Sequence, residues 1–305
     1  MNTARSLDQQ HAYQTLQQIL NDAVKQGKLF APARDIQGFS HQQHQQQIHF
    51  SVQTGAGAYF IKCNDLSHRP QYQAEHTSLL TIIASETLAT CAPLAVGAVD
   101  DQSYLILQHL SLALHGDWFS AGQQLAQMHQ HHSGMGYGFD NTSYCGDTPQ
   151  DNRWNDNWAD FFIDQRLKPL INQLAARGIH FSQQQACLAN AQQLLADHHP
   201  AASLLHGDLW SGNIGFNNDK QLPYPMIFDP ASYYGDAETD LAMTELFGRL
   251  PKKFYDGYQS ISAPLDGYQQ RRNIYQLYHL LNHALLFGDH YIEQSERMML
   301  DIIAA

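Results

Sequence analysis

An aspartate and an asparagine lie five residues apart in a loop that follows a short apolar run, and this spacing constrains the chain most. The loop reads His-Gly-Asp-Leu-Trp-Ser-Gly-Asn over residues 206–213, and Ile-Phe-Asp-Pro follows at 227–230. A short loop that leaves a predicted strand at Leu204-Leu205 lets Asp208 and Asn213 converge. A hairpin partner of that strand, over 225–228, would bring Asp229 beside them. The sequence therefore predicts a polar site where these strands end.

The types of these three side chains suit magnesium-assisted phosphoryl transfer. The Asp208 carboxylate can accept the proton of an attacking hydroxyl, while the Asn213 amide oxygen and the Asp229 carboxylate can hold Mg²⁺ against nucleotide phosphates. Each residue alone has an ordinary interpretation: a loop-capping Asp, a turn Asn after Gly, and an Asp-Pro turn. All three in this order favour catalysis, with ATP and Mg²⁺ as cofactors.

Length and composition limit the class of protein. At 305 residues and 43% apolar composition, the chain can form a large core and two lobes. A net charge of −12 argues against a nucleic-acid partner. The N-terminus has no signal-peptide pattern and no apolar run reaches a membrane span. With no C-x-x-C pair, the four cysteines fit a reducing compartment. We expect a cytoplasmic protein without a membrane partner, either a monomer or a homodimer.

Hydrophobic periodicity predicts an α+β chain with two lobes. The first, over 1–108, has an antiparallel sheet with strands near 48–52, 58–62, 94–99 and 103–107, and helices over 6–28 and 71–89. The second, over 109–305, is larger and mainly helical, with helices over 121–131, 157–177, 183–198, 239–247 and 271–287. Between them lies Gln108-His109-Leu110, where Gln108 and Leu110 are expected to contact a nucleotide bound in the cleft.

A lysine and a glutamate of the first lobe extend the candidate site. Lys62 ends a predicted strand, where it can reach phosphate oxygens as a point charge. Glu75 lies on the following helix and is a natural ion-pair partner for it. A surface lysine and a solvated glutamate are the alternative, but the company of Asp208, Asn213 and Asp229 favours the functional interpretation.

The loop that should cover the phosphates has no glycine-rich signature. Residues 55–57 predict a turn between two strands, so the covering loop is expected within 38–47. Ser40 and backbone N–H groups could contact phosphate there, although a Gln/His loop approaches less closely than glycine does. The histidines of this region indicate a solvated polar loop over 41–49 rather than a metal site: His41, His44 and His49.

Other residues near the loop have predicted supporting roles. His206 is expected to brace the catalytic loop by hydrogen bonds. Asp236 suits a helix N-cap, and Asp240 could tie the loop to that helix. Trp210, a large ring inside the loop, either packs structurally or forms one wall of the acceptor pocket, and its place in the loop favours the pocket.

Two segments, 204–213 and 228–235, closely resemble the fructosamine/ketosamine 3-kinases. The Trp after the catalytic Asp-Leu and the Asp-Pro-Ala-x-x-Tyr-Gly run distinguish these from their wider relatives, the aminoglycoside phosphotransferases and choline kinases. Further matches lie at 137–141, 154–162 and 275–283, and Lys62 and Glu75 fall where the family's lysine and glutamate are expected. The family's glycine-containing loop corresponds here to Ala-Arg-Asp-Ile-Gln at 33–37, which keeps only Asp-Ile.

The resemblance implies a protein-kinase-like fold and ATP-dependent phosphorylation of the 3-hydroxyl of ketosamines, free or protein-bound, such as fructosamines and ribulosamines. The unstable product would release the amine, which is deglycation. By position, Asp208 would be the base and Lys62 the phosphate contact. Asn213 and Asp229 would bind magnesium, and the sugar side would involve Trp210, Asn282 and His283.

Two other functions remain open from the sequence. One is a kinase of another hydroxyl compound, such as an aminoglycoside or choline. The other is a non-catalytic nucleotide-binding protein, which the altered loop would suit.

Overall fold

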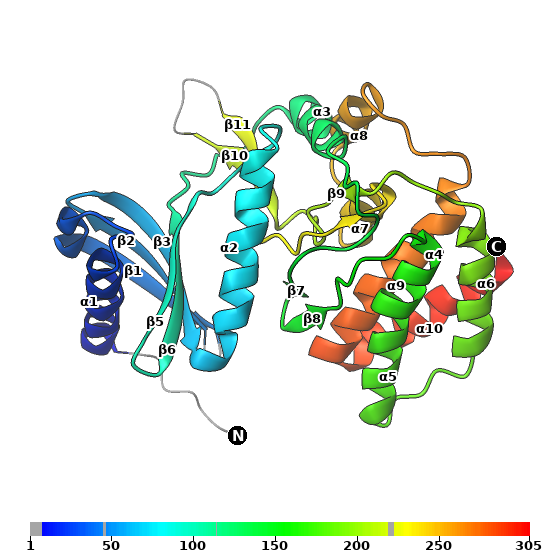
Figure 1. The fold of residues 1–305 in the computed structure, drawn as a ribbon, viewed down its shortest axis with the longest axis horizontal. Helices are drawn as coiled ribbons and strands as arrows, with labels where there is room; N and C mark the ends of the chain where they lie inside the picture. Colours follow the sequence, from blue (N-terminus) through cyan, green and yellow to red (C-terminus); the bar gives the residue numbers. More distant parts are fainter. Residues whose placement is uncertain (1–7, 45–46, 114, 219–222) are drawn as a thin grey trace.

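A computed structural model describes residues 8–44, 47–113, 115–218 and 223–305. An antiparallel sheet with flanking helices precedes a mainly helical region, as predicted (Figure 1). The α-helices are α1 (Gln9–Lys25), α2 (Arg69–Ala84), α3 (Trp118–Met128), α4 (Trp158–Phe162), α5 (Lys168–Ala176), α6 (Gln184–Ala196), α7 (Glu238–Leu246), α8 (Lys252–Gln259), α9 (Tyr268–Phe287) and α10 (Asp289–Ala304). Within the described ranges, no helix has the length and apolarity to cross a membrane.

The strands are β1 (Ile36–His44), β2 (Gln47–Thr54), β3 (Gly57–Asp65), β4 (Ala89–Thr90), β5 (Pro93–Val99), β6 (Gln102–Gln108), β7 (Ser143–Cys145), β8 (Thr148–Gln150), β9 (Ser203–Leu204), β10 (Ile214–Asn217), β11 (Tyr224–Ile227) and β12 (Tyr234–Gly235). The main sheet has the order β1-β2-β3-β6-β5. The lobe boundary at residue 108 stays a prediction. Strand β6 ends at this residue, but β4, which precedes residue 108 in the chain, pairs with β11, which follows it.

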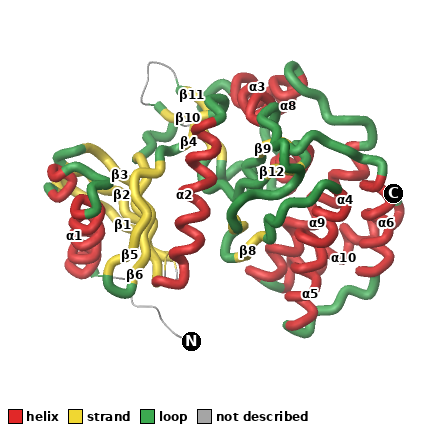
Figure 2. The backbone as a smooth tube through the Cα atoms, viewed as in Figure 1, coloured by secondary structure: helices red, strands yellow, loops and turns green. Residues whose placement is uncertain are grey.

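The main sheet lies between α1 and α2 (Figure 2). Alternate side chains of a strand point to opposite faces, and β6 shows this clearly. Its Ile106 packs in the cluster that contains Leu16 of α1, whereas Leu105 and Leu107 pack with Tyr72 and other residues of α2. The sheet is therefore buried on both faces, and α2 stands between it and the helical region (Figure 1).

Two predicted loops are strands in their described residues: the phosphate-covering loop within 38–47 and the solvated polar loop over 41–49. Residues Ile36–His44 form β1, which pairs with β2 in an antiparallel register that sets Ser40 opposite Ser51. The turn between these strands, at 45–46, lies outside the described residues. A polar sequence can form this strand because β1 is an edge strand, where one row of backbone groups and many side chains face water.

The pairing predicted for the strand at 204–205 is also wrong. β9 pairs with β12, while β11 pairs with β10 and with β4. The chain reverses within the loop at 206–213, so the strand that meets β11 is the one that leaves this loop. Asp229 nevertheless ends beside the loop, because β11 runs antiparallel to β10 and ends where β10 begins.

The helical region is built around α9. Its Tyr275 packs against Trp158 and Phe162 of α4, with ring centroids 6.1 and 5.1 Å apart. The helix predicted over 157–177 is α4 and α5 joined by a π-helical turn, Ile163–Leu167. The sequence did not predict α8 or α10, which cover the core with only a few buried residues each.

Helices α3 and α8 cross at two glycines. A Cβ at Gly122 would overlap the carbonyl oxygen of Phe254, and a Cβ at Gly257 would overlap that of Phe119. We expect Gly122→Ala to lower the free energy of unfolding by about 1–3 kcal/mol, because the backbones of the two helices must separate to admit the Cβ. This cost outweighs the higher helix propensity of alanine relative to glycine. Urea unfolding would measure this. Gly134→Ala is the control, since nothing lies within 4 Å of its Cβ position; equal stabilities of the two variants would contradict the prediction.

Candidate active site

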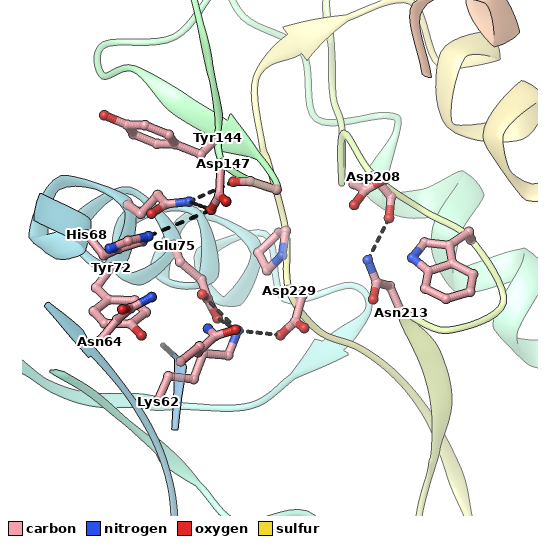
Figure 3. Close-up of a pocket in the computed structure, with 15 residues that line it drawn as sticks. Lys62, Asn64, His68, Tyr72, Glu75, Tyr144, Asp147, Asp208, Asn213 and Asp229 are labelled. Carbon is pink, nitrogen blue, oxygen red and sulfur yellow. Dashed lines mark hydrogen bonds and ion pairs between the residues drawn. The ribbon is translucent and has the colours of Figure 1, made fainter. Parts of the chain in front are cut away.

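A cleft of about 730 Å³ lies between the sheet region and the helical region. It is lined by β3 and α2 on one side and by the turn after β7, the loop at 206–213 and the residues after β11 on the other (Figure 3). The lining residues are Gln47, Lys62, Asn64, His68, Gln71, Tyr72, Glu75, Tyr144, Gly146, Asp147, Asp208, Trp210, Asn213, Asp229 and Pro230.

Lys62 joins three elements at the centre of this cleft. Its Nζ lies 2.8 and 2.9 Å from the two carboxylate oxygens of Glu75 and 2.8 Å from Oδ1 of Asp229. Burial opposes the charge of Lys62, but the two carboxylates outweigh it and hold its pKa above the usual range. The lysine therefore stays cationic in the cleft.

Asp229 has a backbone conformation that is uncommon outside glycine. Its φ is +58°, in the left-handed region, which aspartate tolerates better than most residues. Burial would raise the pKa of Asp229, but the Lys62 ammonium overrides this and lowers the pKa below the ordinary value. With 48% of the side chain exposed and Oδ1 taken by Lys62, the ionised carboxylate still presents Oδ2 to the cleft.

The loop at 206–213 is fixed by one buried carboxylate. Asp240 of α7 accepts the backbone N–H of His206 at 2.7 Å and that of Gly207 at 2.9 Å. Gly207 has φ +85°, and a Cβ there would overlap the carbonyl oxygen of Ala231. The predicted tie between the loop and the helix at Asp240 is confirmed. Asp236 also accepts a helix N-terminal N–H, from Glu238 at 3.0 Å.

His206 connects the loop at 206–213 to the segment after β11. The backbone N–H of Asp208 donates to its Nδ1 at 3.2 Å, so Nε2 carries the proton and donates to the Phe228 carbonyl at 3.0 Å. Burial keeps the pKa of His206 below its usual value, which maintains this neutral tautomer. The predicted bracing role of His206 is confirmed, because it links Asp208 to the residue before Asp229.

Asn213 and Asp229 fit a magnesium ion. The Asn213 amide nitrogen donates to the Asp208 carbonyl at 2.9 Å, which turns its oxygen away from that bond. Both residues line the cleft, and carboxylate and amide oxygens are ligands that Mg²⁺ accepts. Among the described residues, two His/Cys/Asp/Glu groups have the spacing for a metal: Cys145-Asp208-His279, which includes Asp208 of the cleft, and His198-Asp236-Glu238.

Asp208 has the environment of a proton acceptor. Burial, with help from the Asp229 and Asp240 carboxylates, raises its pKa to about 7. Its Oδ1 is buried without a hydrogen-bond partner among the described residues, and 20% of the side chain is exposed. A carboxylate whose pKa is near neutral is well matched to accept a proton from a hydroxyl.

Several predicted site residues lie outside the cleft. Ser40 is exposed on β1, Gln108 is exposed where β6 ends, and Leu110 packs in the cluster with Tyr72. Asn282 is buried and donates to the Cys145 carbonyl at 3.1 Å, and His283 packs against Phe247 with ring centroids 4.5 Å apart. None of these five residues lines the cleft, and their assignment to the nucleotide or the sugar stays a prediction.

The segment at 33–37 also lies away from the cleft lining. It forms a 3₁₀ turn (Ala31–Arg34) and the start of β1. The backbone N–H of Gly55 donates to the Asp35 carbonyl at 2.9 Å, so this segment packs on the turn between β2 and β3.

Trp210 does line the cleft, with 38% of its surface exposed. Its ring lies over Gly212, where a Cβ would overlap it. A cleft wall that the sequence missed is the turn after β7. Gln71 of α2 donates to the Gly146 carbonyl at 2.8 Å and to Asp147 at 2.9 Å, which joins the two sides. These polar residues belong to no motif, so no sequence signal identified them.

Comparison with known proteins places the chain among kinases of related fold. It matches the fructosamine kinase family over residues 13–305. It is 41% identical over 247 residues to a "probable ketoamine kinase" of Synechocystis, covering 80% of this chain and 83% of that protein. A crystal structure assigned as a fructosamine-3-kinase of Haemophilus somnus superposes with a TM-score of 0.85 at 25% identity, covering 93% and 96% of the two chains.

A more distant structure shows the wider fold. It is a thermostable mutant of the aminoglycoside phosphotransferase APH(4)-Ia in ternary complex with ADP and hygromycin B. Its TM-score is 0.59 at 15% identity, covering 88% of this chain and 94% of that one. The predicted protein-kinase-like fold is confirmed.

Because the pKa of Asp208 is higher in the folded protein than in the unfolded chain, ionisation of Asp208 destabilises the folded state. The folded value of about 7 exceeds the unfolded value of about 3.9, so the cost grows as pH rises between them and is level above 7. We expect Asp208→Asn to stabilise the protein by on the order of 1–3 kcal/mol more at pH 8 than at pH 5. Urea unfolding at both values would test this, with the exposed Asp197→Asn as control; a gain that is the same at both values would contradict it.

Proposed function

This chain belongs to the fructosamine kinase family, and we propose that it transfers the γ-phosphoryl group of ATP to the 3-hydroxyl of ketosamines. One observation carries the proposal. Lys62 and Glu75 from the sheet region and Asp208, Asn213 and Asp229 from the helical region converge on one cleft (Figure 3). This set contains a phosphate-binding cation, a proton acceptor and oxygen ligands for magnesium, which phosphoryl transfer requires.

The residues divide the reaction between them. Lys62, held by Glu75, would bind phosphate oxygens of ATP. Asp208 would accept the proton of the sugar hydroxyl. As it does so, the hydroxyl oxygen would bond to the γ-phosphorus, and the bond from that phosphorus to the leaving oxygen of ADP would break. Mg²⁺, held by Asn213 and Asp229, would neutralise charge on the β- and γ-phosphates. Trp210 would offer a flat apolar wall to the acceptor.

We propose that the reaction serves the repair of glycated amines, which the match to the fructosamine kinase family supports. Enolisation of the ketone toward the amine-bearing carbon would allow the phosphate on the other neighbouring carbon to leave. Water would then hydrolyse the carbon–nitrogen bond of the resulting imine and free the amine. We propose that free and protein-bound ketosamines both fit, since the cleft is open to solvent. All four cysteines are free and buried, which supports a reducing, cytoplasmic location.

An aminoglycoside or another hydroxyl compound is the second candidate for the acceptor. The observation in its favour is the fold shared with APH(4)-Ia. That likeness concerns the fold alone, and the family match over 13–305 favours ketosamines.

Purified protein with Mg-ATP and a ribulosamine or fructosamine should release ADP. We expect Asp208→Asn to lower turnover by on the order of a hundredfold or more, because the proton acceptor is lost. The product, analysed by NMR, should carry phosphate on the 3-oxygen of the sugar.

A panel of acceptors makes this assay decisive. Faster turnover on an aminoglycoside or on choline would overturn the assignment of the substrate. If wild-type protein consumed ATP no faster than Asp208→Asn with every acceptor, and ATP raised its melting temperature without Mg²⁺, the chain would be a non-catalytic nucleotide-binding protein.

Removing the proposed amide ligand should weaken magnesium binding. We expect Asn213→Ala to raise the Mg²⁺ concentration for half-maximal activity by on the order of tenfold or more. The Mg²⁺ dependence of thermal stabilisation by ATP should shift in parallel, which separates binding from turnover. Ser211→Ala, exposed in the same loop, is the control; an unchanged Mg²⁺ dependence in Asn213→Ala would contradict the assignment.

A further inference from the structure

Two buried polar atoms, one of them on the proposed base, lie close to each other and make no hydrogen bond of ordinary length among the described residues. They are Oδ1 of Asp208 and Nδ1 of His279, 3.8 Å apart. The Cys145 thiol also lies near the Asp208 carboxylate and favours its ionised form. His279 lies on α9 and is 4% exposed. A buried polar atom left without a hydrogen bond costs free energy, so two such atoms in the same place indicate an interaction that the site completes.

Oδ1 of Asp208 and Nδ1 of His279 attract each other only if a proton lies between them. Burial, with a smaller contribution from His283, lowers the pKa of His279 to about 3, while Asp240 opposes this. The ring is therefore neutral and carries one N–H. A nitrogen lone pair facing the Asp208 carboxylate would repel it, whereas an N–H at Nδ1 would donate to it.

Helix α9 is held firmly enough to position that N–H. Asn282, three residues after His279 and so on the same side of the helix, donates to the Cys145 carbonyl at 3.1 Å. The ring of His279 also packs edge-on against Tyr278, with centroids 4.9 Å apart. His279 and its helix are thus attached to the β7 segment beside the cleft.

We infer that His279 is a positioning residue for Asp208, donating from Nδ1 to Oδ1 and so directing the other carboxylate oxygen toward the acceptor hydroxyl. The inference rests on the proposed kinase function. A closing movement of roughly 0.9 Å brings the pair from 3.8 Å to ordinary hydrogen-bond length. Because Oδ1 is fully buried, only Oδ2 of Asp208 can meet a substrate in the cleft.

A metal ion is the competing explanation for this cluster. Ligand atoms of Cys145, Asp208 and His279 lie within 4.8 Å of one another, a donor set that zinc accepts. Metal binding needs a thiolate, however, and Cys145 is 2% exposed, in surroundings that raise its pKa well above the usual value. A neutral imidazole satisfies the carboxylate without an ion.

Three substitutions test the position of the donor. Asn carries its amide nitrogen near the place of Nδ1, whereas Gln carries it near the place of Nε2. We expect His279→Asn to keep turnover within about threefold of wild type, and His279→Gln and His279→Leu to lose on the order of 10- to 100-fold, because a misplaced base costs that much. The KM for ATP should not change. In His279→Leu the acid limb of the turnover profile should move to higher pH, since the carboxylate loses a donor.

Controls separate this role from folding and from the proposed function. Leu277→Ala, a buried change on the same helix, should keep the wild-type turnover per folded molecule, with the folded fraction measured by circular dichroism. Equal turnover in His279→Asn and His279→Gln, or an unmoved acid limb in His279→Leu, would overturn the inference while wild-type activity upheld the kinase. Stoichiometric zinc in the purified wild-type protein, measured by mass spectrometry, would also overturn it. Absence of kinase activity in wild type would instead reject the proposed function.

Discussion

The ionic contact of Lys62 with Glu75 and Asp229 holds the site together. It joins β3, α2 and the segment after β11, so it fixes how the sheet region meets the helical region. Two carboxylates around one ammonium compensate the cost of burying it, and removal of any one charge would leave the others unbalanced. Asp229, one of these two carboxylates, has a left-handed backbone conformation beside the cleft.

A second buried network leaves a charge disfavoured instead of stabilising it. Asp240 and His206 satisfy the backbone of the loop at 206–213 with three hydrogen bonds, and this rigidity sets Asp208 in a place where water is scarce. Burial near two other carboxylates then raises its pKa to about 7. The loop is held in place by hydrogen bonds, whereas the ionised form of the Asp208 carboxylate is disfavoured. A proton acceptor needs this arrangement, which folding alone would not favour.

The sequence predicted the central strands and α2 well, and it identified five residues that share one cleft, because these features have strong local signals. Alternation identified the central strands, and loop spacing identified Asp208 and Asn213. It failed at β1, whose Gln/His composition resembles a loop, and at the pairing of β9, which depends on where the chain reverses. The assignment of Asn282 and His283 to the sugar side rests on resemblance and stays a prediction; in the structure these residues contact Cys145 and Phe247.

The sequence by itself determined the chemistry of this protein: a lysine, a glutamate, two aspartates and an asparagine in an order that suits phosphoryl transfer. Only the tertiary structure decided how they meet, and it added His279, 71 positions after Asp208, to the same place. The physical reason is that periodicity and spacing report local conformation, whereas helix packing brings together residues whose separation in the sequence carries no signal. Burial, and with it the pKa of Asp208, arises at that level.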